Sequence, residues 1–563
     1  MHSEFFKSIW LPCIVLGITL MARIFYILDF TDEQQYYGEL IGLLQTDRLF
    51  SNDLFVQQTV WLLYYPFIKP YYSLVGDFGL IVYARSLLAL TIIIFFFWST
   101  KKLLNLGVPT AIAAWASVAL SFSFSPGNVF AISYNSIGLL ALAVFCLKFL
   151  AWEQENWSSK RHVSAWAAIP FLAAFAHPTI SIVIALLTFT RVLLSRSWPL
   201  LGLLLFFFAM AVVAGLIIAF SFARFEDYML ALEFSKGFGV GTTFFFSSTE
   251  INRYLISCAL LITGAVITLP VSGLLPALAA LGYGVYLCRL FVTGEIAYGI
   301  SYDTLQAMSI LMMLLFLALN TSADWRPKSR LMALLLLILG SVYAMTSGNG
   351  VRSMLGPMFI AFPILTACVA CNAVKRLPGK AKLGSVFGTL LSVMSVALMV
   401  TYWSFFPYRS DTWFRSNHMP GDPAPILAGL RMGENGVGFL NSAKTAFGEL
   451  SGERVLLTGY APVLYFSLRT TAETCMFFMH SLHTDVSRSA LSSCLEKKQP
   501  DVVVMINYQH AGAPILAINE LVKSVYSLTD CQDSVLQVAN YDGRGSSRLK
   551  DTTFTKCQVA WDR

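Results

Sequence analysis

The residues best suited to chemistry lie in one polar stretch, Asp29 to Pro70, directly after the first apolar run. Asp32 and Glu33 are adjacent, Tyr36 follows shortly after, and Asp53 comes later in the stretch. A carboxylate can take the proton from a hydroxyl group while a new bond forms, which is general base catalysis. Since only 13% of the chain is charged, we interpret the acidic pair as functional. The alternative is ordinary surface charge on an interfacial helix.

The composition predicts a membrane-embedded frame around this stretch. Of 563 residues, 56% are hydrophobic, and the mean hydropathy is +0.65. These values exclude an ordinary soluble class and are typical of a polytopic α-helical membrane protein. Apolar windows near the length that spans the hydrocarbon core predict about thirteen transmembrane helices. They are expected at residues 9–28, 80–99, 108–125, 133–151, 163–176, 179–194, 198–222, 254–270, 272–292, 304–320, 331–346, 353–372 and 383–403.

Positive charge predicts the orientation of these helices. Segment 9–28 has no strongly basic flank and no small-residue cleavage site, so we expect a retained helix. With the amino terminus in the cytoplasm, the basic loop residues gather on the cytoplasmic side, as the positive-inside rule requires. These residues are Lys101, Lys102, Lys160, Arg161, Arg196, Arg326, Lys328, Arg330, Lys375, Arg376, Lys380 and Lys382. The net charge of +7 therefore needs no nucleic-acid partner. An odd number of spans places the first loop, 29–79, and the carboxyl-terminal region outside the cytoplasm.

The composition changes after Trp403, and this change predicts two domains. Residues 1–403 are expected to form the transmembrane domain. Residues 404–563 are expected to form a soluble extracytoplasmic domain of ordinary size. Apolar periodicity there predicts a small α/β unit, with a buried strand at 503–506 and helices at 424–430 and 515–525.

Cysteine placement agrees with an external carboxyl-terminal domain. Cys475, Cys494, Cys531 and Cys557 lie in this domain, and an even number fits two disulfides in an oxidising compartment. Four cysteines allow several pairings, and the sequence leaves the choice open. The remaining cysteines lie in apolar runs, where cysteine packs as a small hydrophobe.

Outside the cytoplasm there is no supply of nucleotide sugars, so a sugar-transferring enzyme there must use a donor carried by a membrane lipid. A polyprenyl-phosphate sugar brings its own leaving group, and the acceptor hydroxyl needs a carboxylate base. The departing phosphate needs a cation, for which Arg is well suited. Asp32 or Glu33 is the candidate base. The candidate cations near outer helix ends are Arg23, Arg85, Arg253, Arg289 and Arg352.

Arg352 is the preferred cation among these arginines. It lies in the sequence Ser-Gly-Asn-Gly-Val-Arg-Ser, a glycine-rich turn whose amides can approach a phosphate closely. Arg85 is also assigned to substrate binding, whereas Arg23 is close enough to the interface to snorkel. His177 is interpreted as a substrate-binding residue or as a residue at a helix end. Segment 223–250 is interpreted as a mobile gate or as an ordinary exposed loop.

Two short motifs in the first loop match a known family. They are Asp32-Glu33-x-x-Tyr36 and Asp53-Leu54-Phe55, the latter shortly before the second span. With the overall layout, they resemble the GT-C superfamily of polyprenyl-phosphate-sugar-dependent glycosyltransferases, which includes protein O-mannosyltransferases and the lipid A aminoarabinose transferase. The resemblance implies a GT-C-like fold in which Asp32 is the catalytic carboxylate and Glu33 its neighbour. Several members carry a second acid, sometimes with metal, in the second outer loop. Segment 125–135 has no acid, so no metal or other cofactor is expected.

We therefore predict transfer of a sugar from a polyprenyl-phosphate donor to an extracytoplasmic acceptor, by an inverting mechanism at the inner or plasma membrane. The acceptor is a cell-envelope glycan, a lipid or a protein. One alternative is a glycan polymerase or ligase, which would use a diphosphate-linked oligosaccharide and a late outer loop rich in Arg and His. A transporter would show internal repeats with broken helices. A non-catalytic relative would use its exported domain to bind a partner.

Overall fold

The structure is a computed structural model that describes most of the amino-terminal 237 residues and most of the chain after residue 424. The described residues are 2–26, 28, 32–124, 129–152, 160–194, 198–237, 418–419, 424–447, 450, 452–458, 463–475, 485–507, 513–541 and 547–560, with isolated positions between 360 and 400. The predicted spans between 254 and 346 lie outside these residues. Those at 353–372 and 383–403 are described only at isolated positions.

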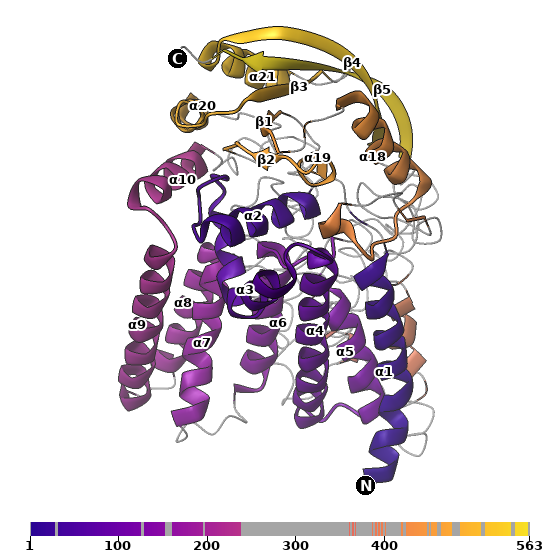
Figure 1. The fold of residues 1–563 in the computed structure, drawn as a ribbon. Coiled ribbons are helices and arrows are strands. Elements are labelled where there is room, and N and C mark those ends of the chain that lie inside the picture. Colours follow the sequence, from indigo (N-terminus) through magenta and orange to yellow (C-terminus); the bar gives the residue numbers. More distant parts are fainter. Residues whose placement is uncertain are drawn as a thin grey trace, which may run out of the picture.

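The amino-terminal part is an upright bundle of helices (Figure 1). Its members are α1 (His2–Phe25), α4 (Leu80–Asn105), α5 (Thr110–Phe122), α6 (Tyr134–Leu150), α7 (Lys160–Ala176), α8 (Pro178–Leu194) and α9 (Trp198–Ser221). These helices lie where the first seven apolar segments were predicted. By length and composition, two described stretches are able to cross a membrane, Leu80–Asn105 and Pro199–Ser221, and the others are shorter apolar helices.

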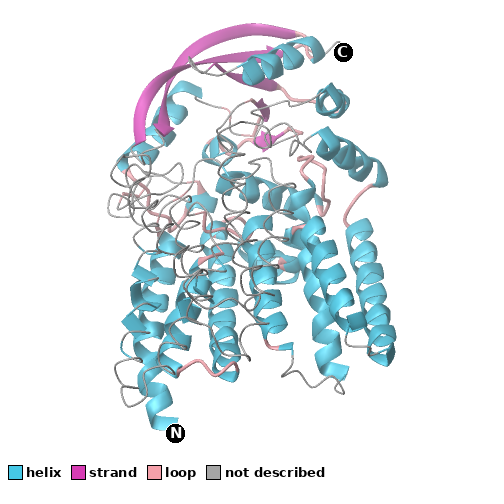
Figure 2. Ribbon diagram, turned by 180° about the vertical axis from the view of Figure 1, so that it is seen from behind, coloured by secondary structure: helices cyan, strands magenta, loops and turns pink. Residues whose placement is uncertain are grey.

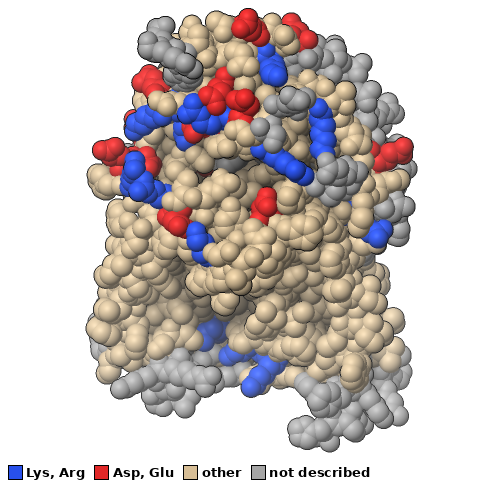
Figure 3. All heavy atoms as spheres, in the orientation of Figure 1, with Lys and Arg blue, Asp and Glu red and all other residues tan. Residues whose placement is uncertain are grey.

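The surface of the bundle supports a lipid environment. Within the described residues, only 6% of the apolar window of α9 is buried. Leu90, Ile94 and Phe97 of α4 are exposed on one side of that helix. Exposed apolar area on this scale is rare on a soluble monomer. On the face drawn in Figure 3, a broad belt without charged residues separates the acids and bases near the top from a few basic residues at the lower end.

The first loop folds into three short helices at the upper end of the bundle. They are α2 (Asp32–Thr46), the 3-10 helix η1 (Val56–Leu63) and α3 (Tyr65–Val75). Helix α2 lies across the bundle, below the carboxyl-terminal sheet (Figure 1). It forms there because Leu40, Leu43 and Leu44 recur at helical spacing, and all three side chains are buried.

The carboxyl-terminal part is a small mixed sheet with helices, seen from behind in Figure 2. The strands are β1 (Arg454–Leu457), β2 (Thr471–Ala472), β3 (Val502–Asn507), β4 (Leu528–Tyr541) and β5 (Ser547–Val559), in the order β2-β1-β3-β5-β4. Strand β1 pairs in parallel with β2 and β3, whereas β5 pairs antiparallel with β3 and β4. The helices are α18 (Glu434–Phe447), α19 (Val463–Ser467), α20 (Asp485–Leu495) and α21 (Ala513–Val525).

One strand, one helix and the two disulfides predicted for this part are confirmed. The strand at 503–506 lies in β3, the helix at 515–525 lies in α21, and the four cysteines form two disulfides, Cys475–Cys494 and Cys531–Cys557. The prediction of a helix at 424–430 is wrong. Only a 3-10 turn, η6 (Pro425–Leu427), is present, and Gly429 follows it with a φ of +84°. That left-handed conformation, which glycine adopts readily, ends the turn.

The two parts of the chain share one hydrophobic core, which runs from the bundle into α18, α19 and β1. The Arg431 amide donates to the carbonyl of Phe25, at 2.7 Å, where α1 ends. The Gly79 amide, just before α4, donates to the carbonyl of Pro425, at 2.8 Å. Helix α10 (Phe225–Gly237) packs against α20. The interpretation of 223–250 as an ordinary exposed loop is therefore wrong for 225–237, while its interpretation as a mobile gate stays a prediction. Residues 238–250 lie outside the described residues.

Candidate functional site

Glu33 and Arg85 form a buried ion pair where α2 begins. Arg85 Nη2 lies 2.6 Å from Glu33 Oε1, and Arg85 Nε donates to the same oxygen at 2.8 Å. Each side chain is only 1% exposed. A buried charge is costly unless its partner stays in place. The pair therefore fastens the first turn of α2 to the upper part of α4.

Arg85 also caps the carboxyl-terminal end of α1. Its Nη1 donates to the carbonyls of Arg23 and Ile24, at 3.1 and 3.2 Å. These carbonyls belong to the last turn of α1, where a helix has no further amides of its own to satisfy them. One guanidinium therefore joins the end of α1, the start of α2 and the side of α4.

Asp32, the predicted base, is the first residue of α2, and its side chain lies outside what the structure describes. Successive residues of an α-helix are about 100° apart around the axis. Positions 32 and 33 therefore belong to different faces of α2. Positions three, four and seven residues after Asp32 share its face, and these are Gln35, Tyr36 and Glu39.

Tyr36 and His177, both predicted as substrate-binding residues, contact the same aromatic ring. The centroid of Tyr134 lies 6.1 Å from that of Tyr36 and 6.3 Å from that of His177. Tyr36 and His177 are buried, and Tyr134 is partly buried. Ser133 caps the start of α6 and so places Tyr134. His177 lies between α7 and α8. The structure thus brings together residues from α2, α6 and the α7–α8 junction.

Asp53, another predicted substrate-binding residue, shapes the loop before η1. Its Oδ1 accepts a hydrogen bond from the Phe55 amide at 2.8 Å. Gln58 Nε2 donates to the Asp53 carbonyl at 2.8 Å, and Gln58 Oε1 accepts from the Phe50 amide at 3.0 Å. Asp53 and Gln58 are both buried. Asp53 therefore lies inside the first loop, with one oxygen used to hold the loop's own backbone.

Glu39 is a buried carboxyl that the sequence analysis missed. It is 2% exposed, and Gln35 Nε2 donates to its Oε1 at 3.2 Å. Burial, and then the nearby negative charge of Asp53, hold the pKa of Glu39 well above its usual range. Its place seven residues after Asp32, on the same face of α2, was the signal that could have revealed it.

The other predicted cations differ in what the structure shows of them. Arg352 lies outside the described residues. Arg23 is 7% exposed, and its guanidinium lies 4.9 Å from the centroid of the Phe130 ring. It is therefore buried against an aromatic ring, and the prediction that it snorkels to the interface is wrong. Within the ranges the structure describes, no three His, Cys, Asp or Glu side chains gather in a way that could hold a metal ion.

No protein-family model and no curated protein matches this chain.

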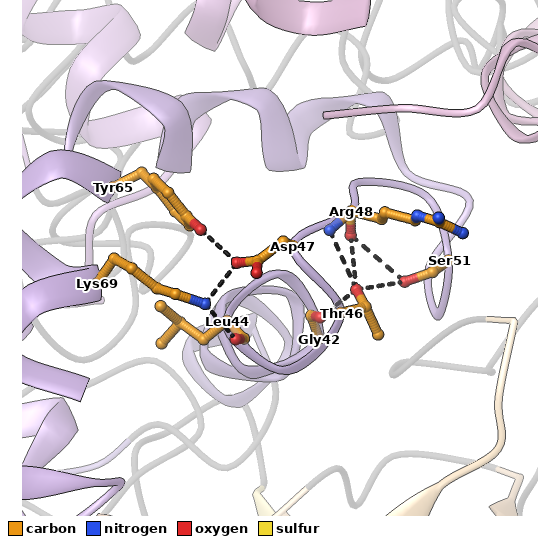
Figure 4. A network of polar contacts seen from close by, with 8 residues as sticks. All are labelled: Gly42, Leu44, Thr46, Asp47, Arg48, Ser51, Tyr65 and Lys69. Atoms are coloured by element: carbon orange, nitrogen blue, oxygen red, sulfur yellow. Dashed lines mark hydrogen bonds and ion pairs between the residues drawn. The ribbon is translucent and has the colours of Figure 1, made fainter. Parts of the chain in front are cut away.

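A second polar network lies at the opposite end of α2. Figure 4 shows Tyr65 and Lys69 of α3 pointing towards Asp47, just past the end of α2. Lys69 Nζ also donates to the Leu44 carbonyl at 3.0 Å, which satisfies a carbonyl of the last turn of α2. Asp47 is 58% exposed at its side chain and has a φ of +52°. The network ends α2 and fastens α3 beside it.

Together these contacts fix α2 at both ends, by Arg85 at its start and by Lys69 at its end. A helix held in this way presents its faces in constant directions. The face that carries Asp32 includes the hydrogen-bonding groups of Gln35, Tyr36 and Glu39. These three side chains are themselves buried.

Proposed function

We propose that this protein is a polytopic membrane glycosyltransferase that moves a sugar from a polyprenyl-phosphate donor onto an extracytoplasmic acceptor. The proposal includes about thirteen transmembrane helices, a cytoplasmic amino terminus and an external carboxyl-terminal domain. The acceptor class is a cell-envelope glycan, lipid or protein. In this proposal α2 lies at the outer surface of the membrane, where the donor's phosphate and the acceptor meet.

The observation that carries the proposal is the ion pair between Glu33 and Arg85. It separates the roles of two adjacent acids. Glu33 is engaged by Arg85 and holds α2 in position. Asp32, one position earlier and on another face of the helix, is assigned the role of base. The pair supplies the rigid support that a reacting group needs, because small displacements of a catalytic side chain greatly reduce rates.

The chemistry follows from these assignments. Asp32 takes the proton of the acceptor hydroxyl as its oxygen forms a bond to the anomeric carbon of the sugar. The bond between that carbon and the phosphate oxygen breaks, and its electron pair leaves with the lipid phosphate. Attack from the opposite face inverts the configuration. Arg352 is assigned the task of neutralising the phosphate, and Tyr36, Asp53 and His177 are assigned to the substrate site.

Three further features support the outer location of the site. The described helices form an apolar bundle with an uncharged belt on the face drawn in Figure 3. The carboxyl-terminal domain holds two disulfides, which are typical of oxidising compartments. That domain lies at the same end of the bundle as α2 (Figure 1).

The test is sugar transfer by the purified protein in lipid vesicles supplied with labelled polyprenyl-phosphate sugars and envelope acceptors. We expect Asp32→Asn to lose at least about a hundredfold in rate, the usual size of a general-base contribution. Asp77→Asn, which removes another acid of the same outer loop, is the matched control and should remain active. Full activity of Asp32→Asn would remove Asp32 as the base. Transfer by the native protein only from diphosphate-linked oligosaccharides would replace the proposal with a ligase.

The sugar and the acceptor can be identified together by mass analysis of envelope glycans from cells with and without the gene. The proposal expects one sugar substituent to disappear while the underlying acceptor remains. If the envelope glycans of the two cell types were identical, the transferase proposal would be abandoned in favour of transport or binding.

A further inference from the structure

The carboxyl-terminal domain contacts the first loop at both of its ends, through Gln34 and Gly79, and at a third segment, residues 51–55. Lys498, just after α20, donates from its Nζ to the Ser51 carbonyl at 2.6 Å and to Asn52 Oδ1 at 2.8 Å. The Leu54 amide donates to the Cys475 carbonyl at 3.0 Å. These hydrogen bonds therefore join two segments that are far apart in the chain.

Apolar contacts reinforce this interface between residues 51–55 and the carboxyl-terminal domain, which we call the seam. Leu54 and Phe55 are buried in a cluster with Leu491 and Leu495 of α20, separate from the main core. Phe234 of α10 packs edge-on against Phe55, with ring centroids 5.6 Å apart. The loop thus packs into an apolar cluster of the carboxyl-terminal domain, to which α10 contributes Phe234.

One disulfide lies in this seam and the other does not. Cys475, whose carbonyl receives the Leu54 amide, is bonded to Cys494 in α20. It lies three residues after the end of β2, which is the strand at one edge of the sheet. Cys531 and Cys557 join β4 to β5, which form the opposite edge. The two bonds close chain segments of similar length, with sequence separations of 19 and 26. Their effects on the entropy of the unfolded chain should therefore be similar.

The loop needs such support because its backbone is strained. Phe50 has a φ of +64°, in the left-handed region that bulky side chains rarely adopt. Its ring packs against Tyr228, with centroids 5.7 Å apart, and its amide is held by Gln58. A strained conformation persists only when surrounding contacts hold it in place.

We propose that the carboxyl-terminal domain is a clamp that positions the first outer loop, through Lys498, α20 and the Cys475–Cys494 disulfide. The clamp grips residues 51–55 and so fixes Asp53 beside Glu39 of α2. Lys498 is a positioning residue in this account and touches no substrate. The proposal goes beyond the proposed sugar transfer and does not depend on it, because the clamp is defined by contacts within the chain.

Hydrogen exchange on the full-length protein in lipid nanodiscs tests the clamp, with peptides that cover residues 47–58 as the readout. We expect Lys498→Met to speed exchange of these amides by about tenfold, since a charge-assisted donor to the loop is lost. Lys497→Met changes the neighbouring exposed lysine and should leave exchange unchanged. Lys498→Arg keeps a long cationic donor and should restore protection. Equal exchange in the two Met variants would overturn the proposal.

The disulfides provide a second, independent arm. Replacing Cys475 and Cys494 together with Ser should speed exchange of residues 47–58, whereas replacing Cys531 and Cys557 together should not. If both pairs had the same effect on the loop, the disulfides would act only on general stability and the clamp would be wrong. Where the native protein transfers sugar, Lys498→Met should also change KM and kcat unequally, and Lys498→Arg should reverse this change. If the native protein transfers no sugar, the exchange result still decides the clamp.

Discussion

The guanidinium of Arg85 lies against the carboxylate of Glu33 in a site that excludes solvent, with each side chain 1% exposed. The same guanidinium holds the last carbonyls of α1. Among the described residues, this side chain therefore connects the end of α1 to the start of α2.

Arg85→Met should be strongly destabilising. It leaves Glu33 as an uncompensated buried charge, and loss of one partner of such a pair typically costs about 3–5 kcal/mol. The double variant Glu33→Gln with Arg85→Met should recover part of the loss, because no charge then remains buried. Thermal unfolding in detergent measures this, with Arg454→Met as a comparison that breaks the half-exposed pair of Arg454 with Asp501, since such pairs are worth about 0–1 kcal/mol. A double variant as unstable as the sum of both single variants would contradict this account.

Stability should fall as pH rises above the ordinary range of glutamate, because of Glu39. Its pKa in the folded protein is raised by burial and by Asp53, so the folded state holds a proton that the unfolded chain releases. The loss begins near the unfolded value of about 4.3 and is complete above the raised pKa of the folded state. Glu39→Gln should flatten the dependence of the unfolding temperature on pH in this window. Glu434→Gln, at an exposed position of α18, should leave the dependence unchanged. An unchanged slope in Glu39→Gln would contradict the prediction.

The effect of a substitution at Asp47 on stability should depend more on the backbone conformation at this position than on the charge of the side chain. With a φ of +52°, this position suits Asn or Gly. Asp47→Asn should therefore change stability by less than about 1 kcal/mol, the usual value of an exposed ion pair. Asp47→Val should cost about 1–2 kcal/mol more, since β-branched residues fit the left-handed region poorly. The unfolding temperatures of the two variants can be compared directly, and a Val variant as stable as the Asn variant would rule out the strain argument.

Sidedness can be tested on intact cells. An epitope tag after Arg563 should be accessible to antibody without permeabilisation, because the disulfide-bonded domain is proposed to be external. A tag before Met1 should become accessible only after permeabilisation. The opposite pattern would place α2 in the cytoplasm, where nucleotide sugars are available, and the argument for a lipid-linked donor would no longer hold.

Helices and covalent links were predictable from the sequence because their signals are local. Long apolar runs placed the first seven helices of the bundle, and an even set of cysteines in a soluble region predicted two disulfides. The apolar pattern gave a wrong prediction where a single residue determined the backbone conformation. At Gly429, a left-handed backbone ends the turn that an apolar run had suggested would be a helix.

Contacts between distant segments were not predictable from a single sequence. Glu33 and Arg85 were each predicted as site residues, but nothing in their positions along the sequence shows that they form an ion pair. Glu39 was overlooked because a single acid on an amphipathic helix suggests a solvated position, whereas the folded chain buries it. The seam between Leu54 and Cys475 is likewise a property of the folded chain.

The hydrogen bond between Leu54 and Cys475 joins residues that the ribosome makes about 420 positions apart. At about 5–20 residues per second, the loop must wait on the order of 20–80 s for its partner to be synthesised. During that interval Leu54 and Phe55 have no apolar cover from the carboxyl-terminal domain. A nascent chain stalled before residue 475 should therefore be recognised by chaperones or membrane proteases, and nonsense mutations late in the gene should abolish accumulation of the whole protein.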